Sequence, residues 1–478
     1  MDTTVAASYE EQRLPNKLAS SDALSFSQQL LQASGFDKFG PDFAAKLCNN
    51  GMAGASSYDE AVTLLKSEGV KLWQAALDRV QGRVVQGTLS KSDDRMLYWA
   101  RLTMTLALRQ WKPDFPLSDD QRAALQNEFE RASRGQYAID FPEGPQYKRI
   151  LVSGFDPFTL GAAGKDGQLG MLKGNPSGAT ILSLDGNTVA LADGTTAVIH
   201  TFILPVNYGP FIAGMQEDTL GPWFKPGSKR VDASVTMSQG RSSFDLEHYN
   251  GRYHFANFVG NDNLNPPCEG DGLPATLECD INPPQRWLGY SPTPWRRDAP
   301  PQFIAATLPF QQLIEAKTGA DLEGGGWAVA RNDDYDVGPC TQAASDTEAA
   351  YNLAKANEKA ALDAYYAAST ADKPAALQKY FEAYGVAQAA ARPSPLETNC
   401  ALNGGGGNYL SNASAYRNTL MRDIFGLTIP AGHIHTPTMQ TPSGVTSAGF
   451  EANRDKIVAQ SRNLIFAVAK SLATSSAP

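Results

Sequence analysis

Arg149-Ile150-Leu151-Val152-Ser153-Gly154 is the stretch at which the pattern of this 478-residue chain changes. It is a short apolar run that ends at a glycine, which is typical of a buried strand. Residues 197–206 and 233–237 repeat this pattern, and residues 326–330 are a fourth candidate strand. Helical patterns separate the strands, the last of them over residues 452–473. Strands that alternate with helices predict a mostly parallel sheet covered on both faces, a three-layer α/β/α sandwich.

The chain before this stretch has a different pattern. Over residues 1–145, apolar residues recur at steps of three and four, as in 96–108, which is typical of amphipathic helices. Ser118 followed by two acidic residues predicts a further helix start. We therefore expect an all-helical N-terminal unit over residues 1–145 and an α/β/α domain over residues 146–478. The N-terminal unit shows no catalytic constellation, which favours a role in packing, shielding or partner binding.

Two insertions interrupt the expected α/β/α domain. Residues 261–300 are rich in Asn, Pro and Gly and predict a long loop. Residues 341–392 are rich in Ala and lightly charged, and Lys373-Pro374 divides them in two. This second pattern predicts a helical hairpin.

Four of the five cysteines lie in or beside these insertions. Their spacing favours two disulfides, Cys268–Cys279 and Cys340–Cys400, with Cys48 left over; the alternative is five reduced, scattered cysteines. Because disulfides persist in oxidising compartments, the first interpretation favours a secreted or extracytoplasmic location, and a cytoplasmic one stays open. None of the cysteines belongs to a CxxC pair, so we expect no zinc site or other metal, and no cofactor.

Composition narrows the class of partner. Hydrophobic residues make up 42% of the chain and charged residues 19%, as in folded soluble proteins. The formal net charge of −9 argues against a nucleic-acid partner. No apolar run is long enough to span a bilayer, so we expect no membrane segment. A small-molecule or peptide substrate remains, and the sequence leaves the oligomeric state open.

Residues 404–412 and 432–437 carry the side chains that acyl transfer needs. Ser411 follows a glycine-rich turn, and His435 lies 24 residues further on. A nucleophile needs a proton acceptor, and a developing oxyanion needs backbone N–H donors. Glycine lets the backbone approach a ligand closely, which makes Gly406 and Gly407 candidate oxyanion-binding residues.

Six motifs, in this order along the chain, resemble those of the pyroglutamyl peptidase I family. They are Gly154-Phe155-Asp156-Pro157-Phe158 with Asn175-Pro176-Ser177, Leu204-Pro205-Val206-Asn207-Tyr208, the segment from Gly240-Arg241 to Glu247, Thr307-Leu308-Pro309, Gly407 to Asn412, and Gly432 to Pro437. The resemblance covers about residues 148–475 without the insertions.

This resemblance implies an α/β/α sandwich and a catalytic group of glutamate, cysteine and histidine. Carried over by position, Glu247 takes the glutamate place and His435 the histidine place. Ser411 stands where the family has its cysteine, with the spacing to the histidine kept. The family motif favours His435 over its neighbour His433, although both could share one face of an extended segment.

The resemblance also implies a substrate pocket. Phe155 and Phe158 take the place of the aromatic walls around a lactam ring, and Tyr409 stands beside the nucleophile. Gln239 is the nearest match to the family's glutamine, whose aligned position holds Met237. The pocket therefore favours a related lactam, amide or ester as much as a pyroglutamyl peptide. Arg241 is either a structural ion-pair partner or a site residue, and we expect the structural role.

Three interpretations of Ser411 follow. In the first, the protein is a hydrolase, a serine variant of a cysteine peptidase, in which His435 removes the Ser411 proton and Glu247 orients His435. In the second, it is a catalytically inactive binding or scaffold protein that retains the fold. In the third, Ser411 is a Cys-to-Ser substitution that inactivates a pyroglutamyl peptidase.

Overall fold

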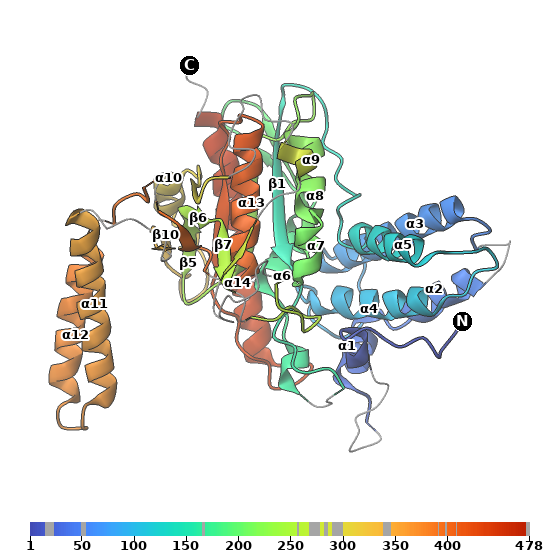
Figure 1. The fold of residues 1–478 in the computed structure, drawn as a ribbon, viewed down its shortest axis with the longest axis horizontal. Coiled ribbons are helices and arrows are strands. Elements are labelled where there is room, and N and C mark those ends of the chain that lie inside the picture. The colour runs from blue at the N-terminus through green and yellow to red at the C-terminus, as the bar shows by residue number, and fades with distance from the viewer. Residues whose placement is uncertain are drawn as a thin grey trace.

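The structure is a computed structural model, and seven of its strands form a central sheet flanked by helices (Figure 1). It describes residues 1–14, 23–48, 54–164, 168–255, 258–266, 278–281, 285–288, 300–337, 346–390, 392–396, 399–407 and 409–474.

The central sheet has seven strands, and most of their pairings are parallel. In spatial order they are β10 (Val329–Asn332), β5 (Phe244–Glu247), β13 (Ala431–Thr436), β4 (Ala233–Gln239), β1 (Tyr147–Phe155), β3 (Thr196–Leu204) and β2 (Thr188–Ala190). β13, β4, β1 and β3 run parallel to one another, whereas β5 is antiparallel to β13 and β2 is antiparallel to β3. The predicted mostly parallel sheet is confirmed. The short apolar runs at β1, β3 and β4 are nearly all buried, as strands covered on both faces must be.

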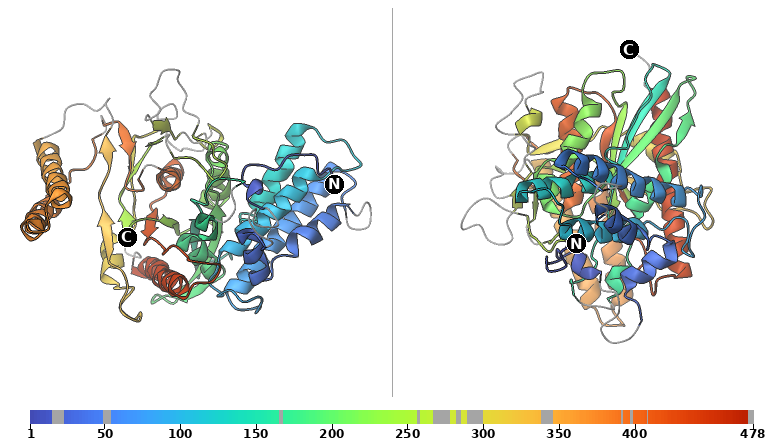
Figure 2. Two further views of the ribbon diagram at one scale, coloured as in Figure 1. Left: turned by 90° about the horizontal axis from the view of Figure 1, so that it is seen from below. Right: turned by 90° about the vertical axis from the view of Figure 1, so that its right-hand side faces the viewer.

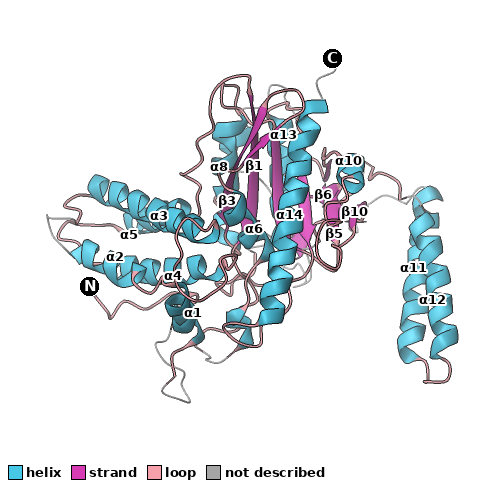
Figure 3. Cartoon of the chain, turned by 180° about the vertical axis from the view of Figure 1, so that it is seen from behind, coloured by secondary structure: helices cyan, strands magenta, loops and turns pink. Residues whose placement is uncertain are grey.

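Helices cover both faces of this sheet and complete the three layers (Figures 1 and 3). α6 (Pro176–Leu184) and α14 (Ala448–Thr474) pack together on one face, joined by α10 (Phe310–Glu315). α8 (Met215–Phe224) and α13 (Leu410–Ile424) pack together on the other, near α7 (Tyr208–Ile212). The predicted three-layer α/β/α sandwich is therefore confirmed.

Helices also make up the N-terminal region, which lies at one side of the sandwich (Figure 2). They are α1 (Phe26–Ser34), α2 (Phe39–Cys48), α3 (Tyr58–Val80), α4 (Arg95–Gln110) and α5 (Asp119–Ala132). α5 begins as expected, because the Ser118 hydroxyl accepts from the Gln121 N–H while the Gln121 side chain accepts from the Ser118 N–H.

The two insertions differ in how closely they follow the sequence expectation. Residues 346–390 form a helical hairpin of α11 (Asp346–Ala367) and α12 (Lys373–Ala389), which projects away from the sandwich (Figure 1). Pro374 stands in the first turn of α12, where its missing N–H costs nothing.

The expected long loop over residues 261–300 contains secondary structure. Its described part includes β8 (Glu278–Asp280), which pairs with β7 (Tyr253–Phe255), and the short helix α9 (Gln285–Leu288). Two further short pairs join β6 (Tyr249–Gly251) to β9 (Phe303–Ala305) and β11 (Asp336–Val337) to β12 (Ala401–Asn403).

The strand expected over residues 326–330 begins later, at Val329. The side chain of Gln460 on α14 accepts a hydrogen bond from the Trp327 N–H and donates one to the Trp327 carbonyl, both over 2.8 Å. The backbone N–H and carbonyl of Trp327 therefore bond to a side chain on α14 instead of to a neighbouring strand. β10 begins two residues later, at Val329.

Of the predicted disulfide partners, Cys268 and Cys340 lie outside the described residues, so both pairings stay predictions. Cys48 is an exposed free thiol. The predicted location outside the cytoplasm, which depends on the disulfides, also stays a prediction.

A buried acidic residue joins the N-terminal helices to the sandwich. Asp94 precedes α4 and accepts a hydrogen bond from the Asn175 N–H over 3.0 Å. Burial, together with the neighbouring Asp93 carboxylate, raises the pKa of Asp94 to about 7. The ionised form of this carboxyl is therefore disfavoured in the folded protein.

This raised pKa predicts a pH dependence of stability. Between pH of about 4 and 7, the folded protein keeps a proton on Asp94 that the unfolded chain has released. This extra proton stabilises the folded state, and the contribution falls as the pH rises and is lost above about 7. Relative to wild type, Asp94→Asn should therefore become more stable as the pH rises across that window. Urea unfolding at several pH values measures the difference, with the exposed Asp120→Asn as control. A difference that does not change with pH would contradict the prediction.

Candidate active site

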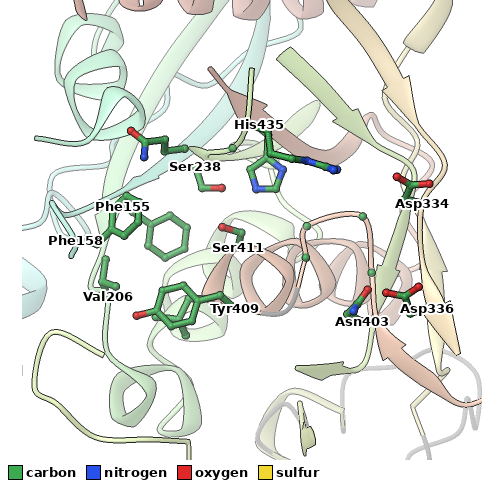
Figure 4. A pocket seen from close by; sticks show the side chains of 18 of the residues that line it. Phe155, Phe158, Val206, Ser238, Asp334, Asp336, Asn403, Tyr409, Ser411 and His435 are labelled. Atoms are coloured by element: carbon green, nitrogen blue, oxygen red, sulfur yellow. The ribbon is translucent and has the colours of Figure 1, made fainter. Parts of the chain in front are cut away.

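A cavity of about 600 Å³ opens at the carboxyl ends of β1, β4 and β13. This is the edge at which α/β sheets bind ligands, and the volume suits a small molecule. Figure 4 shows its labelled side chains: an aromatic and aliphatic group on one side, acidic and amide groups on the opposite side, and Ser411 and His435 between them. The sequence-predicted residues that line it are Phe155, Phe158, Gln239, Gly406, Gly407, Tyr409, Ser411 and His435.

Glu247 lies directly behind His435. In the antiparallel pair of β13 and β5, His435 stands opposite Asp245, which places Glu247 at the diagonal position on the same face of the sheet. The Nδ1 of His435 lies 2.6 Å from the Glu247 Oε1, and the Nδ2 of Asn332 donates to the Glu247 Oε2 over 2.7 Å. An ionised Glu247 accepts this hydrogen bond from an Nδ1–H, and the neutral tautomer with its hydrogen on Nδ1 leaves Nε2 as a proton acceptor.

The environment of Glu247 is fully enclosed. Its side chain has no exposed surface, and burial raises its pKa, although the hydrogen bond from His435 opposes that rise. Gly405 is essential to this arrangement, because a Cβ at that position would lie 2.3 Å from the Glu247 Oε2. The glycine-rich turn therefore allows the backbone to close over the carboxylate.

The same turn leads into Ser411. α13 begins at Leu410, so Ser411 lies in its first turn, where N–H groups lack helical partners. Gly407 has φ of +79° and donates its N–H to the Gly404 carbonyl over 2.9 Å, so that group is engaged. Within the described part of the chain, the N–H groups of Gly406 and Ser411 have no hydrogen-bond partner, and both residues line the cavity.

Ser411 and His435 face each other across the cavity (Figure 4). The Ser411 hydroxyl makes no hydrogen bond to any described residue. Catalytic hydrogen bonds are often long in unliganded sites and tighten when a substrate binds. The site thus holds a hydroxyl, an imidazole, a buried carboxyl and two N–H groups, and neither the His435 Nε2 nor these N–H groups bond to a described residue.

Aromatic side chains form the wall on the far side of Ser411. Phe155 is buried and stacks on Phe211 with ring centroids 6.1 Å apart, whereas Phe158 is half-buried. The hydroxyl of Tyr409 donates to the Val259 carbonyl over 2.7 Å, which fixes its ring beside the nucleophile position. This wall suits an apolar or flat acyl group.

The loop that carries Phe155 and Phe158 is anchored from the N-terminal region through Asp156. The Nη2 of Arg101 lies 2.7 Å from the Asp156 Oδ1, and the Nη2 of Arg134 lies 2.8 Å from its Oδ2. All three side chains are buried. Burial lowers the pKa of Arg134 to about 10, and the nearby charge of Arg101 adds to this effect.

Comparison with known proteins places the chain in a family. A family model described as the PA0049 C-terminal domain matches residues 149–440, and one described as the PA0049 N-terminal domain matches residues 1–130. The chain belongs to the PA0049 family. A relative from Pseudomonas aeruginosa, the uncharacterized protein PA0049, is 42% identical over 532 residues, covering 98% of this chain and 90% of the relative.

Solved structures of pyrrolidone carboxyl peptidase from Pyrococcus furiosus are more remote. A point mutant of that enzyme is 14% identical to this chain, and a structure described together with a Cys-free mutant is 15% identical. Each match covers 68% of this chain and 99% of the peptidase, with a TM-score of 0.35.

The PA0049-family chain also has a buried polar cluster around His433, which the sequence named only as the neighbour of His435. The Nε2 of His433 lies 2.8 Å from the Ser238 hydroxyl, and its Nδ1 lies 2.7 Å from the Thr236 hydroxyl. Burial lowers the pKa of His433 well below its usual value, and the neighbouring His435 adds to this. The neutral form of His433 is therefore favoured, and it contacts the hydroxyl of Ser238, a residue of the cavity wall.

Two further expectations can be compared with the cavity wall. The Oε1 of Gln239 accepts from the Met439 N–H over 3.0 Å, while Met237 is fully buried. The expectation that Arg241 is a structural ion-pair partner is wrong. Its side chain is exposed on the cavity wall, and no carboxylate among the described residues pairs with it.

The sequence also missed several residues on the cavity wall. Asn175 caps α6 and donates from Nδ2 to the Asp156 carbonyl over 2.9 Å; its place in the Asn-Pro-Ser motif was the available signal. Tyr351, Asn352 and Lys355 come from the first turns of α11, and no sequence signal tied the hairpin to the site.

The described residues meet neither the requirements of a metal site nor those of a membrane-spanning helix. They contain no group of three His, Cys, Asp or Glu side chains that could hold a metal ion. None of the helices they form has the length and apolar character needed to cross a membrane.

Proposed function

We propose that this protein is a hydrolase of the pyroglutamyl peptidase I type that uses Ser411 as its nucleophile on a lactam, amide or related acyl bond. The observation that carries the proposal is the hydrogen bond of 2.6 Å between the Nδ1 of His435 and Glu247, in the cavity that Ser411 lines. A serine, a histidine and a carboxylate in this order form the usual unit for serine acyl transfer.

In the proposed reaction, the Nε2 of His435 takes the Ser411 proton while Oγ attacks the carbonyl carbon. The N–H groups of Gly406 and Ser411 stabilise the oxyanion. His435 then gives the proton to the leaving nitrogen or oxygen, and the acyl bond to it breaks. Water, deprotonated by His435, attacks the acyl-serine ester and releases the acid and the free hydroxyl. Glu247 orients His435 and stabilises its charged form.

A serine-directed fluorophosphonate tests this proposal without knowledge of the substrate. We expect the reagent to label Ser411 in wild type, as located by peptide mass spectrometry. His435→Ala should remove the labelling, because the hydroxyl then lacks its base. The matched control is His200→Ala, a histidine on β3 whose Nε2 lies 3.1 Å from the Asp140 carbonyl, away from the cavity-lining residues. Labelling that is absent from wild type, or unchanged in His435→Ala, would contradict the proposal.

A further inference from the structure

Arg241 differs from the other cations of the cavity wall. The Nζ of Lys355 lies 2.7 Å from the Glu358 Oε2, and the Nη1 of Arg392 lies 3.5 Å from the Asp334 Oδ1. Arg241 also lines the cavity, but its guanidinium has no carboxylate, hydrogen-bond or aromatic partner within the described ranges. A positive charge is thus left available for a ligand.

The backbone at Arg241 is fixed next to the candidate base. The Gly240 N–H donates to the Thr436 carbonyl and the Thr438 N–H donates to the Arg241 carbonyl, each over 2.7 Å. Gly240 packs so closely on His435 that a Cβ there would lie 2.6 Å from the His435 Cβ. Arg241 is therefore held one residue from the contact with the histidine.

The position of Arg241 beside His435 can be related to the two sides of a bound substrate. A carbonyl carbon at Ser411 has its acyl group on one side and its leaving group on the other. The leaving group must approach His435, which protonates it, and the aromatic wall of Phe155 and Phe158 remains for the acyl group. Arg241 therefore stands on the leaving-group side.

We propose that Arg241 binds a carboxylate on the leaving group, so that the substrates are short acyl-amino acids with a free carboxylate. This inference rests on the proposed function of Ser411. A guanidinium matches a carboxylate through two parallel hydrogen bonds, which gives both charge and geometric selectivity. Hydrolysis breaks the bond between the acyl carbon and the amino-acid nitrogen, which takes the proton carried by His435.

The acidic side chains of the cavity define where this carboxylate can lie. Asp334 accepts from the Tyr351 hydroxyl over 3.1 Å and pairs with Arg392. Asp336 is exposed and has no side-chain partner in the part of the chain that the structure describes. Both would repel an anion, which leaves the Arg241 side of the cavity as the favourable position.

Binding of two matched probes tests this inference separately from turnover. In Ser411→Ala, benzoylglycine should bind about tenfold or more tightly than its neutral amide, measured by calorimetry, since only the acid offers a charged partner to Arg241. Adding Arg241→Gln should remove that preference, whereas Lys355→Gln should keep it. The preference should also shrink as salt concentration rises.

Other outcomes overturn the inference. These are equal binding of acid and amide, no binding of benzoylglycine, or the same loss in Lys355→Gln as in Arg241→Gln. If the fluorophosphonate labels Ser411 but the acid is not preferred, only the carboxylate site fails. If the acid is preferred but Ser411 is not labelled, only the proposed nucleophile fails.

Discussion

Ser411→Ala should lower kcat by about ten-thousandfold, because it removes the atom that forms the acyl-enzyme. Hydrolysis of a panel of p-nitrophenyl esters and acyl anilides measures this loss. The binding of benzoylglycine should survive, since the cavity walls and Arg241 are unchanged. This combination separates a lost nucleophile from a collapsed site.

Ser443→Ala is the matched control for this experiment. Ser443 is an exposed serine outside the cavity, so its replacement should leave hydrolysis and labelling unchanged. Equal rates for wild type and Ser411→Ala would show that this hydroxyl is not the nucleophile. No hydrolysis by wild type across the panel, together with no labelling, would favour the interpretation of a binding protein that retains the fold.

Asp156→Ala should produce the largest loss of stability. It removes one buried carboxylate that pairs with two buried guanidinium groups, Arg101 and Arg134, and leaves both charges without their main partner. Breaking a buried ion pair on one side costs about 3–5 kcal/mol in the free energy of unfolding. The urea midpoint should fall accordingly. KM should rise more than kcat falls in the protein that remains folded, because Phe155 and Phe158 flank Asp156 in the sequence.

An exposed ion pair provides the control for Asp156. Asp140 pairs with Lys229 over 2.7 Å, but its side chain is 80% exposed. Asp140→Ala should therefore cost less than about 1 kcal/mol. If both variants lose the same stability, the anchoring of the substrate wall by the N-terminal helices is contradicted.

Much of the architecture could be predicted because it depends on local patterns. The apolar run before Phe155 and the similar runs at β3 and β4 predicted buried parallel strands, and the Ser118 capping signal predicted the start of α5 within one residue. Sequence patterns mispredicted a strand boundary where a distant side chain forms the hydrogen bonds that a neighbouring strand would otherwise form. Gln460 satisfies Trp327 and so delays β10, and nothing in residues 326–330 reveals it.

Some residues of the candidate site could be predicted from local motifs, and others could not. Ser411, His435 and Glu247 could be named from their motifs, since each stands in a recognisable local pattern. Asn332 and Ser238 could not be assigned, and Arg241 was assigned wrongly, because their roles depend on which strands are neighbours and on which charges find partners.

Local patterns were enough to predict helices followed by a mostly parallel α/β sheet, since periodicity and turn residues act over a few positions. The folded chain was needed to show that Arg101 and Arg134 bind Asp156, and that Arg241 has no partner among the described residues. Those facts depend on burial and on distances between segments that are far apart in the chain. Whether two charged side chains pair depends on their distance in the folded chain, which local sequence patterns do not reveal.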